Sequence, residues 1–166
     1  YEESFIGNLI DSAIVFQDNN LTAINFNDNT PNSEACNFLK TKFDKIDLAL
    51  MNYNAAGPYP SCFNNLNDDQ KKTEHRKILN RNFDHVHKML KILKPKYILP
   101  FAGSYVLGGK NINKNEYLGT TTWDECADYL NEKEISTKVI CMRENQIFDL
   151  SQKKLSSDYE RIDTSE

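Results

Sequence analysis

Two short apolar runs, each ending in a polar loop that favours turns, constrain the fold of this chain more than any other feature. They are the segments LTAINFNDNTPN at residues 21–32 and IDLALMNYNAAGPYPSCF at residues 46–63. Each predicts a buried strand followed by a loop, and α/β proteins bind ligands and metals at such strand ends. The residues just beyond these two strands are therefore the first candidates for a functional site.

Asp28 lies directly after the first of these runs, between Asn27 and Asn29. A carboxylate held beside a buried strand costs free energy unless another group pairs with it. Two interpretations fit this position. Asp28 binds a ligand or metal, or it caps the helix that begins near Ser33 or closes an Asx turn.

The remainder of the chain alternates between strand and helix patterns. From the N-terminus these are a hairpin at 12–26 with its turn at 18–20, a helix at 33–43, a strand at 46–51, a long helix capped at Asn67 or Asp68 and ended by Pro95, a strand at 97–101, a helix at 122–133, and a closing hairpin at 137–150 with its turn at 143–145. The order β-β-α-β-α-β-α-β-β predicts an α/β layered fold. The charged residues 151–166 predict a frayed helix or a tail.

Composition excludes several classes of protein. A chain of 166 residues with 39% hydrophobic content can bury one sizeable core, so we expect one domain. A net charge of -4 and the lack of a basic stripe argue against a nucleic-acid partner. No apolar run approaches the ~20 residues that span a bilayer, and residues 1–11 do not resemble a signal peptide, so we expect a soluble protein without a membrane partner.

The cysteines indicate a reducing compartment. Their spacing contains no CxxC pair, which does not fit a disulfide framework or a zinc knuckle; they are Cys36, Cys62, Cys126 and Cys141. We therefore expect a cytoplasmic location. Because the chain begins with Tyr1 and enters directly into a strand-like pattern, we also expect it to be a fragment of a longer protein.

Three further motifs have a functional and a structural interpretation. The DHVH motif at 84–87 lies inside the long helix, where its two histidines point apart and His75 is about three turns away, so the spacing favours a solvated helix surface over a metal site. The glycine-rich segment 103–110 follows a strand but departs from the P-loop pattern, which favours a simple loop over a phosphate loop. The segment AAGPYPSCF at 55–63 fits a pocket wall, with Gly57 allowing close backbone approach, and equally fits a tight turn on the core.

Taken together, several segments resemble the second half of the metallo-β-lactamase fold. They are NFNDN after a hairpin, IDLALMNYNAAGPYPSCF, KPKYILPFAGSYVLG after a long helix, and KVICMRENQIFDL near the end. The chain is most similar to the branch that includes CMP-N-acetylneuraminate hydroxylase, in which an iron–sulfur Rieske domain can accompany the metallo-β-lactamase domain. The resemblance covers residues 11–150 and implies the C-terminal half of a four-layer αββα sandwich, with 151–166 as a charged C-terminal tail.

The resemblance also implies site residues. Asp28 matches the family's metal-bridging aspartate, and a carboxylate oxygen suits zinc or iron. The family's HxHxDH motif is absent from this chain, and the last metal-binding histidine would fall near Pro100, where Phe101, Ala102 and Gly103 stand instead. One ligand does not make a complete site. The substrate pocket implied by the resemblance would be lined by Tyr53, Tyr59, Ser104, Tyr105 and Lys110.

These implications lead to one functional expectation and one alternative. The chain is expected to be part of a metal-dependent hydrolase or hydroxylase that acts on a phosphorylated or sugar-containing small molecule, such as a nucleotide sugar, with a metal that activates a bound water. Its partner would be a missing N-terminal half or another chain, which would cover an apolar sheet face formed by the hairpin at 12–26. The alternative is a non-catalytic module used for binding or assembly.

Overall fold

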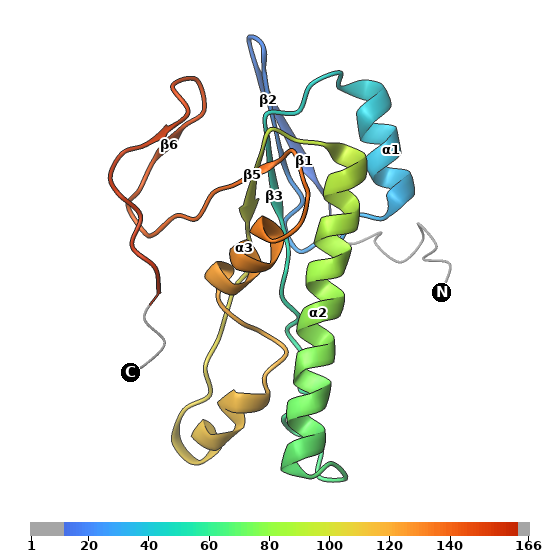
Figure 1. The fold of residues 1–166 in the computed structure, drawn as a ribbon, viewed down its shortest axis with the longest axis vertical. Helices are drawn as coiled ribbons and strands as arrows, with labels where there is room; N and C mark the ends of the chain where they lie inside the picture. The colour runs from blue at the N-terminus through green and yellow to red at the C-terminus, as the bar shows by residue number, and fades with distance from the viewer. Residues whose placement is uncertain (1–11, 163–166) are drawn as a thin grey trace.

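The structure is a computed structural model that describes residues 12–162. Its elements are β1 (Ile14–Asp18), β2 (Leu21–Asn25), α1 (Ser33–Lys42), β3 (Leu48–Met51), α2 (Asp68–Leu93), β4 (Tyr97–Pro100), the 3-10 helix η2 (Gly109–Tyr117), α3 (Trp123–Asn131), β5 (Lys138–Val139), β6 (Phe148–Asp149) and β7 (Lys154–Leu155). The expected α/β class is confirmed, as are the first hairpin, the three predicted helices and the strands that became β3 and β4. Figure 1 shows α1 and α2 beside the strands of the sheet.

The main sheet is mixed and follows the order of the chain. Its strand order is β1-β2-β3-β4-β5, with β1 antiparallel to β2 and all later neighbours parallel. Each parallel connection passes through a helix, and crossovers of one hand in sequential order place their helices on one face of the sheet. The chain after β2 therefore builds the sheet outward from the β1–β2 hairpin, one strand at a time.

The helix ends are set by side chains that satisfy free backbone N–H groups. At the start of α2, Asn67 and Gln70 form a capping box, with both side-chain-to-backbone hydrogen bonds at 2.9 Å. The same helix ends where Lys94 adopts a left-handed conformation (φ 48°) before Pro95, which cannot continue a helix. Asn32 caps α1 by accepting a hydrogen bond from the Ala35 backbone N–H at 2.8 Å.

The core lies between the helices and one face of the sheet. Strand residues 24, 49 and 98 follow one another across β2, β3 and β4, and all three side chains have 0% exposure. They belong to one hydrophobic cluster with residues from all three helices, including Cys36 of α1, Leu90 of α2 and Leu130 of α3. All three helices therefore pack against the same face of the sheet.

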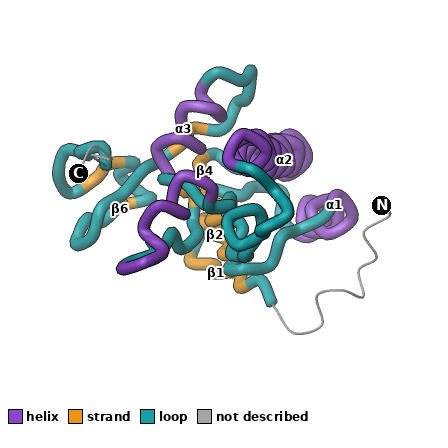
Figure 2. Tube along the Cα trace, turned by 90° about the horizontal axis from the view of Figure 1, so that it is seen from below, coloured by secondary structure: helices purple, strands orange, loops and turns teal. Residues whose placement is uncertain are grey.

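The opposite face of the sheet is apolar and only partly covered. Its central row runs from Phe16 through Ala23 and Leu48 to Tyr97. Tyr97 packs against Phe148 of β6, with ring centroids 5.2 Å apart. At the other end of the row Phe16 is 57% exposed. Figure 2 shows β6 across the sheet from α1 and α2, so the small hairpin covers the β4 side and leaves the β1–β3 side open.

The long helix α2 is much longer than the strands it covers. At about 1.5 Å per residue its 26 residues extend roughly 39 Å, whereas a five-residue strand extends about 17 Å. Its N-terminal half therefore projects past the sheet, where the loops after β3 and β4 and η2 pack beside it (Figure 1). At Gly119 an added Cβ would lie 3.4 Å from Ala55 O, which is ordinary van der Waals contact. At Gly57, where we expected a close backbone approach, an added Cβ would have no neighbour within 4 Å.

The expected closing hairpin is wrong. β5 pairs in parallel with β4 through Tyr97↔Lys138 and Ile98↔Val139, and β6 pairs instead with β7 through Phe148↔Leu155. The reason is that Val139 packs against the core only when it lies beside Ile98, a pairing across 41 positions that local patterns do not reveal.

The chain after residue 150 is not a frayed helix over the part that the structure describes. It forms β7 and then lies against α3, where Trp123 donates a hydrogen bond to the Tyr159 hydroxyl at 2.6 Å and that hydroxyl donates to buried Asp124 at 2.8 Å. Arg161 forms a two-point ion pair with Asp128, with N–O distances of 2.9 and 2.7 Å. These contacts attach residues 154–162 to the domain.

Candidate functional site

The parallel strands end together and place four loops at one edge of the sheet. Backbone hydrogen bonds continue past the strand ends, from Phe26 N to Leu50 O at 3.0 Å and from Phe101 N to Met51 O at 2.9 Å. The next strand continues the edge, because Ile140 N donates to Ile98 O at 2.8 Å. We call this the carboxyl edge, and it is where open α/β sheets bind ligands.

Asp28 lies on the carboxyl edge with an exposed side chain. The helix-cap interpretation is wrong, because Asn32 caps α1. The Asx turn in this loop is formed by Asn25, whose Oδ1 accepts from Asn27 N at 2.8 Å. Within residues 12–162 the Asp28 carboxylate accepts no hydrogen bond and forms no ion pair. The carboxylate is therefore available to a ligand.

The described residues do not provide a complete metal site around Asp28. Across residues 12–162 no group of three or more His, Cys, Asp or Glu side chains is placed to hold a metal ion. Asp28 is a single candidate ligand, and its role as a metal ligand stays a prediction.

Two of the three histidines of α2 form hydrogen bonds with backbone carbonyls of other segments, and all three are partly buried. Nδ1 of His75 forms a short hydrogen bond with Leu118 O, and Nε2 of His85 lies 2.8 Å from Pro31 O. A carbonyl only accepts, so these ring nitrogens carry the protons. His87 is half-buried, and its Nε2 has no hydrogen-bond partner among the described residues. The three histidines therefore lie at a partly buried surface of α2 and are less solvated than the spacing predicted.

A polar cavity of about 150 Å³ lies where the carboxyl edge meets the middle of α2. We call it the edge cavity. Its lining comes from the loop after β2, the loop after β3 and one side of α2: Thr30, Asn52, Tyr53, Asn54, Arg81, Asn82 and His85. Every one of these side chains except that of Tyr53 is predominantly polar, and none is acidic.

Hydrogen bonds hold two walls of the edge cavity in place. The Asn54 side chain donates to Thr121 O and accepts from Thr121 N, both at 3.0 Å. The Tyr53 hydroxyl donates to the same carbonyl at 3.3 Å, and burial raises the pKa of Tyr53, so this hydroxyl stays protonated. His85 ties the β2–α1 loop to α2 through Pro31. The cavity is therefore built from elements whose positions are fixed.

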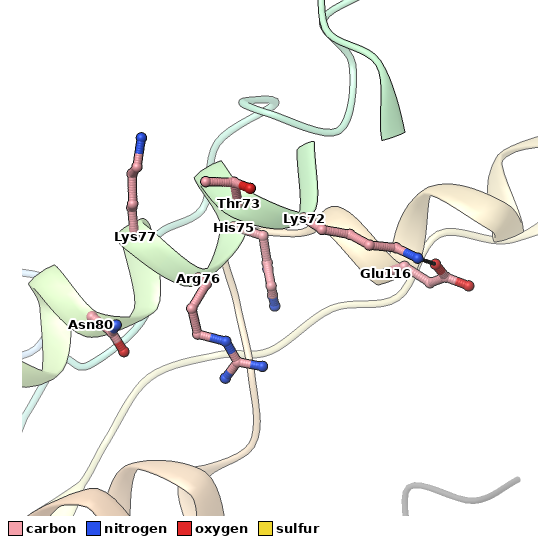
Figure 3. A pocket seen from close by; sticks show the side chains of 7 residues that line it. All are labelled: Lys72, Thr73, His75, Arg76, Lys77, Asn80 and Glu116. Atoms are coloured by element: carbon pink, nitrogen blue, oxygen red, sulfur yellow. Dashed lines mark ion pairs between the residues drawn. The ribbon is translucent and has the colours of Figure 1, made fainter. Parts of the chain in front are cut away.

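An open groove of about 730 Å³ follows the projecting half of α2. Its lining is mostly basic and polar: Lys72, Thr73, His75, Arg76, Lys77, Asn80 and Glu116. Figure 3 shows that Lys77 and Arg76 point in opposite directions and that Lys72 reaches toward Glu116, with Nζ and Oε2 3.5 Å apart. The charged ends of Lys72 and Lys77 therefore do not converge on one point.

The residues predicted to line a substrate pocket lie in different places. Tyr53 borders the edge cavity, while Tyr105 borders a separate apolar pocket of about 320 Å³ and donates to Gly57 O at 3.3 Å. Tyr59 donates to Glu74 on α2 at 2.8 Å. Ser104 is exposed in the loop after β4, and Lys110 is exposed in the first turn of η2. The structure therefore does not bring these five residues together, and their substrate-binding roles stay predictions.

Sequence analysis missed Arg81 and Asn82, and did not connect His85 with the carboxyl edge. A signal was present, since 81 and 85 are four residues apart and 82 and 85 three apart, so these side chains share one side of α2. They lie next to the apolar stripe that contains the buried residues 78, 79 and 86. Polar residues beside the apolar stripe of a helix indicate a site when they lie next to the ends of the strands. Which turn of α2 lies next to the strand ends is set by the tertiary fold.

Comparisons of the chain with models of protein families, with curated proteins and with solved structures found no match. Among the described residues, no helix combines the length and apolar character needed to cross a membrane.

Proposed function

We propose that this chain is one half of a four-layer αββα sandwich of the metallo-β-lactamase type. The observation that supports the proposal is the asymmetry of the sheet, with α1, α2 and α3 on one face and an open apolar surface over β1–β3 on the other. An exposed sheet face of this kind normally packs against another layer. In the proposal that layer is a second sheet, supplied by a preceding N-terminal half or by another chain.

The proposed contact surface is the open part of the sheet. Its most exposed side chains are Phe16 and Ile14, at 57% and 51%, and half-buried Ala23, Leu48 and Leu50 continue it toward the centre. At ~25 cal/mol per Å², burying a few hundred Å² of this surface contributes roughly 5–10 kcal/mol before the cost of association. We expect Leu48→Lys, at the centre of the row, to prevent this association.

The proposed activity is that of a metal-dependent hydrolase or hydroxylase acting on a phosphorylated or sugar-containing small molecule. Asp28 supplies one ligand to zinc or iron at the carboxyl edge. The described residues do not fit a complete metal site, so the remaining ligands belong to the covering half. No catalytic step is assigned to this chain alone.

Metal analysis of the full protein, isolated together with the segment or chain that covers its sheet, tests the proposal. Asp28→Asn should remove at least half of the bound metal and leave the free energy of unfolding within about 0.5 kcal/mol of wild type, because the exposed carboxylate forms no hydrogen bond or ion pair with a described residue. Asp18→Asn is the matched control, an exposed aspartate at the other end of the same hairpin. Equal metal content in all three proteins would reject the role of Asp28.

The alternative is a non-catalytic binding or assembly module, and the same open sheet face favours it. In that case the chain associates through the face around Phe16 and Leu48, but the assembled protein holds no metal. Sedimentation of wild type and Leu48→Lys measures association, and elemental analysis of the same samples separates the two functions. A compact monomer whose sedimentation is unchanged by Leu48→Lys would contradict both.

A further inference from the structure

The edge cavity contains a buried hydrogen-bond donor without an acceptor. The Asn82 side-chain nitrogen is fully covered, and no described residue accepts a hydrogen bond from it. Leaving a buried donor unpaired is unfavourable. A group that fills the cavity and accepts from Asn82 would remove this cost.

Three other side chains that line the cavity, those of Asn52, Arg81 and Thr30, also have donors that are not used elsewhere in the described residues. The Asn52 Oδ1 already accepts from Asn54 N at 2.9 Å, so its amide N–H groups are the free part of that side chain. Arg81 lines the cavity, is exposed, and forms no ion pair with residues 12–162. Thr30 adds a hydroxyl. A cation and several neutral donors without a lining carboxylate favour an anion.

We propose that the edge cavity binds a phosphate group, either as the free ion or carried by a small molecule. Its volume of about 150 Å³ is half the lower end of the ~300–1,000 Å³ range of pockets that enclose drug-sized ligands, so it accepts one group and not a whole cofactor. A tetrahedral oxyanion has enough acceptor oxygens to pair with Arg81, Asn82 and Asn52 at once. Arg81, on the exposed side, supplies the charge.

This inference is independent of the proposed function. The edge cavity is bordered by α2, on the helix-covered side of the sheet, whereas the proposed second layer covers the opposite face. Phosphate binding is therefore measured on the full chain without any metal, and metal content does not report on it. Failure of either proposal leaves the other intact.

Calorimetric titration with inorganic phosphate at low ionic strength tests the inference. We expect one phosphate per chain, at least tenfold weaker binding by Arg81→Gln, and a similar loss for Asn82→Leu, which corresponds to about 1.4 kcal/mol for each tenfold change. Arg76→Gln is the matched control, another exposed arginine on the same helix. Lys110→Ala tests the glycine-rich segment 103–110, which ends in the first turn of η2, as a competing anion site. Both controls should bind within twofold of wild type.

Several outcomes would overturn the proposal: no binding by wild type, as expected if the cavity holds only water; unchanged binding by Arg81→Gln; or loss of binding through Arg76→Gln or Lys110→Ala. Because Arg81 is exposed, its substitution leaves the fold intact even if Asn82→Leu does not fold. Titration with methyl phosphate distinguishes a free phosphate ion from a phosphate group carried by a small molecule. Binding equal to that of inorganic phosphate supports a phosphate carried by a small molecule, and loss of binding assigns the cavity to the free ion.

Discussion

The side chain of Asn54 and the backbone of Thr121 are joined by two hydrogen bonds, each 3.0 Å long. This pair connects the loop after β3 to the segment that leads into α3, 67 residues away. The Asn54 side-chain amide donates one hydrogen bond and accepts one, as the backbone of a neighbouring strand would. It therefore continues backbone-like pairing beyond the end of β3. The wall of the edge cavity depends on this link.

We therefore expect Asn54→Ala to destabilise the protein. At about 0.5–1.5 kcal/mol for each net hydrogen bond, the loss should lie near 1–3 kcal/mol. Asn65→Ala, an exposed asparagine in the same loop, should change stability by less than about 0.5 kcal/mol. Urea unfolding of both variants measures the difference, and equal stabilities would show that the Asn54 link contributes nothing.

Two neighbouring residues of β4 allow the packing on the two faces of the sheet to be compared. Ile98 points into the core and is 0% exposed, whereas Leu99 lies on the opposite face and is half-buried. Ile98→Ala should cost about 2–5 kcal/mol because it leaves a cavity. In the chain without a covering layer, Leu99→Ala should cost less than half as much, as measured by denaturant unfolding. Similar costs for the two variants would mean that the opposite face is already packed.

His87 should make stability depend on pH. Burial lowers the pKa of its imidazole below the ordinary value, Lys91 and Lys133 lower the pKa further, and Asp84 raises it. The folded state therefore favours neutral His87, so its contribution is complete above the unfolded pKa of about 6.5 and is lost as the pH falls through the folded pKa.

The measurement is the free energy of unfolding between pH 7.5 and 5 for wild type and His87→Gln. The variant should lose less stability on acidification than wild type does. Lys91→Gln should also reduce the pH dependence, because it removes a positive neighbour, while exposed Lys88→Gln is the control on the same helix. Identical pH profiles for wild type and His87→Gln would contradict the prediction.

The cysteines should differ widely in reactivity. Cys62 is exposed, whereas Cys36 and Cys126 are buried. Burial raises the pKa of Cys36 to about 11 and raises that of Cys126 further, so neither forms the reactive thiolate at neutral pH. Cys141 is half-buried, and burial raises its pKa to about 11.

Iodoacetamide at pH 8 should therefore alkylate Cys62 first, Cys141 more slowly, and the two buried thiols only after unfolding. Mass spectrometry over time follows each site. In Cys62→Ser the fast phase should disappear, and a fast phase that persists would place another thiol at the surface.

The long helix shows what local sequence can determine. Asn67 and Gln70 form the capping box at its start and Pro95 follows its end, so both boundaries were predictable from side chains a few residues apart. The β1–β2 hairpin was predictable for the same reason, because its turn and both strands lie within 12 consecutive positions. By contrast, β5 was assigned to the wrong partner, since its pairing with Ile98 depends on contacts distant in the chain.

The sequence by itself determined the α/β class, the helices and the strand ends, because periodicity, caps and turns act between neighbouring residues. Asp28 at a strand end belongs to this group. Only the tertiary structure decided that all three helices cover one face, and that Asn52, Arg81 and Asn82 line one cavity. Those relationships depend on the register of parallel strands and on where a helix far longer than the sheet crosses its edge. Both are fixed when distant apolar surfaces pack together, and no local pattern encodes them.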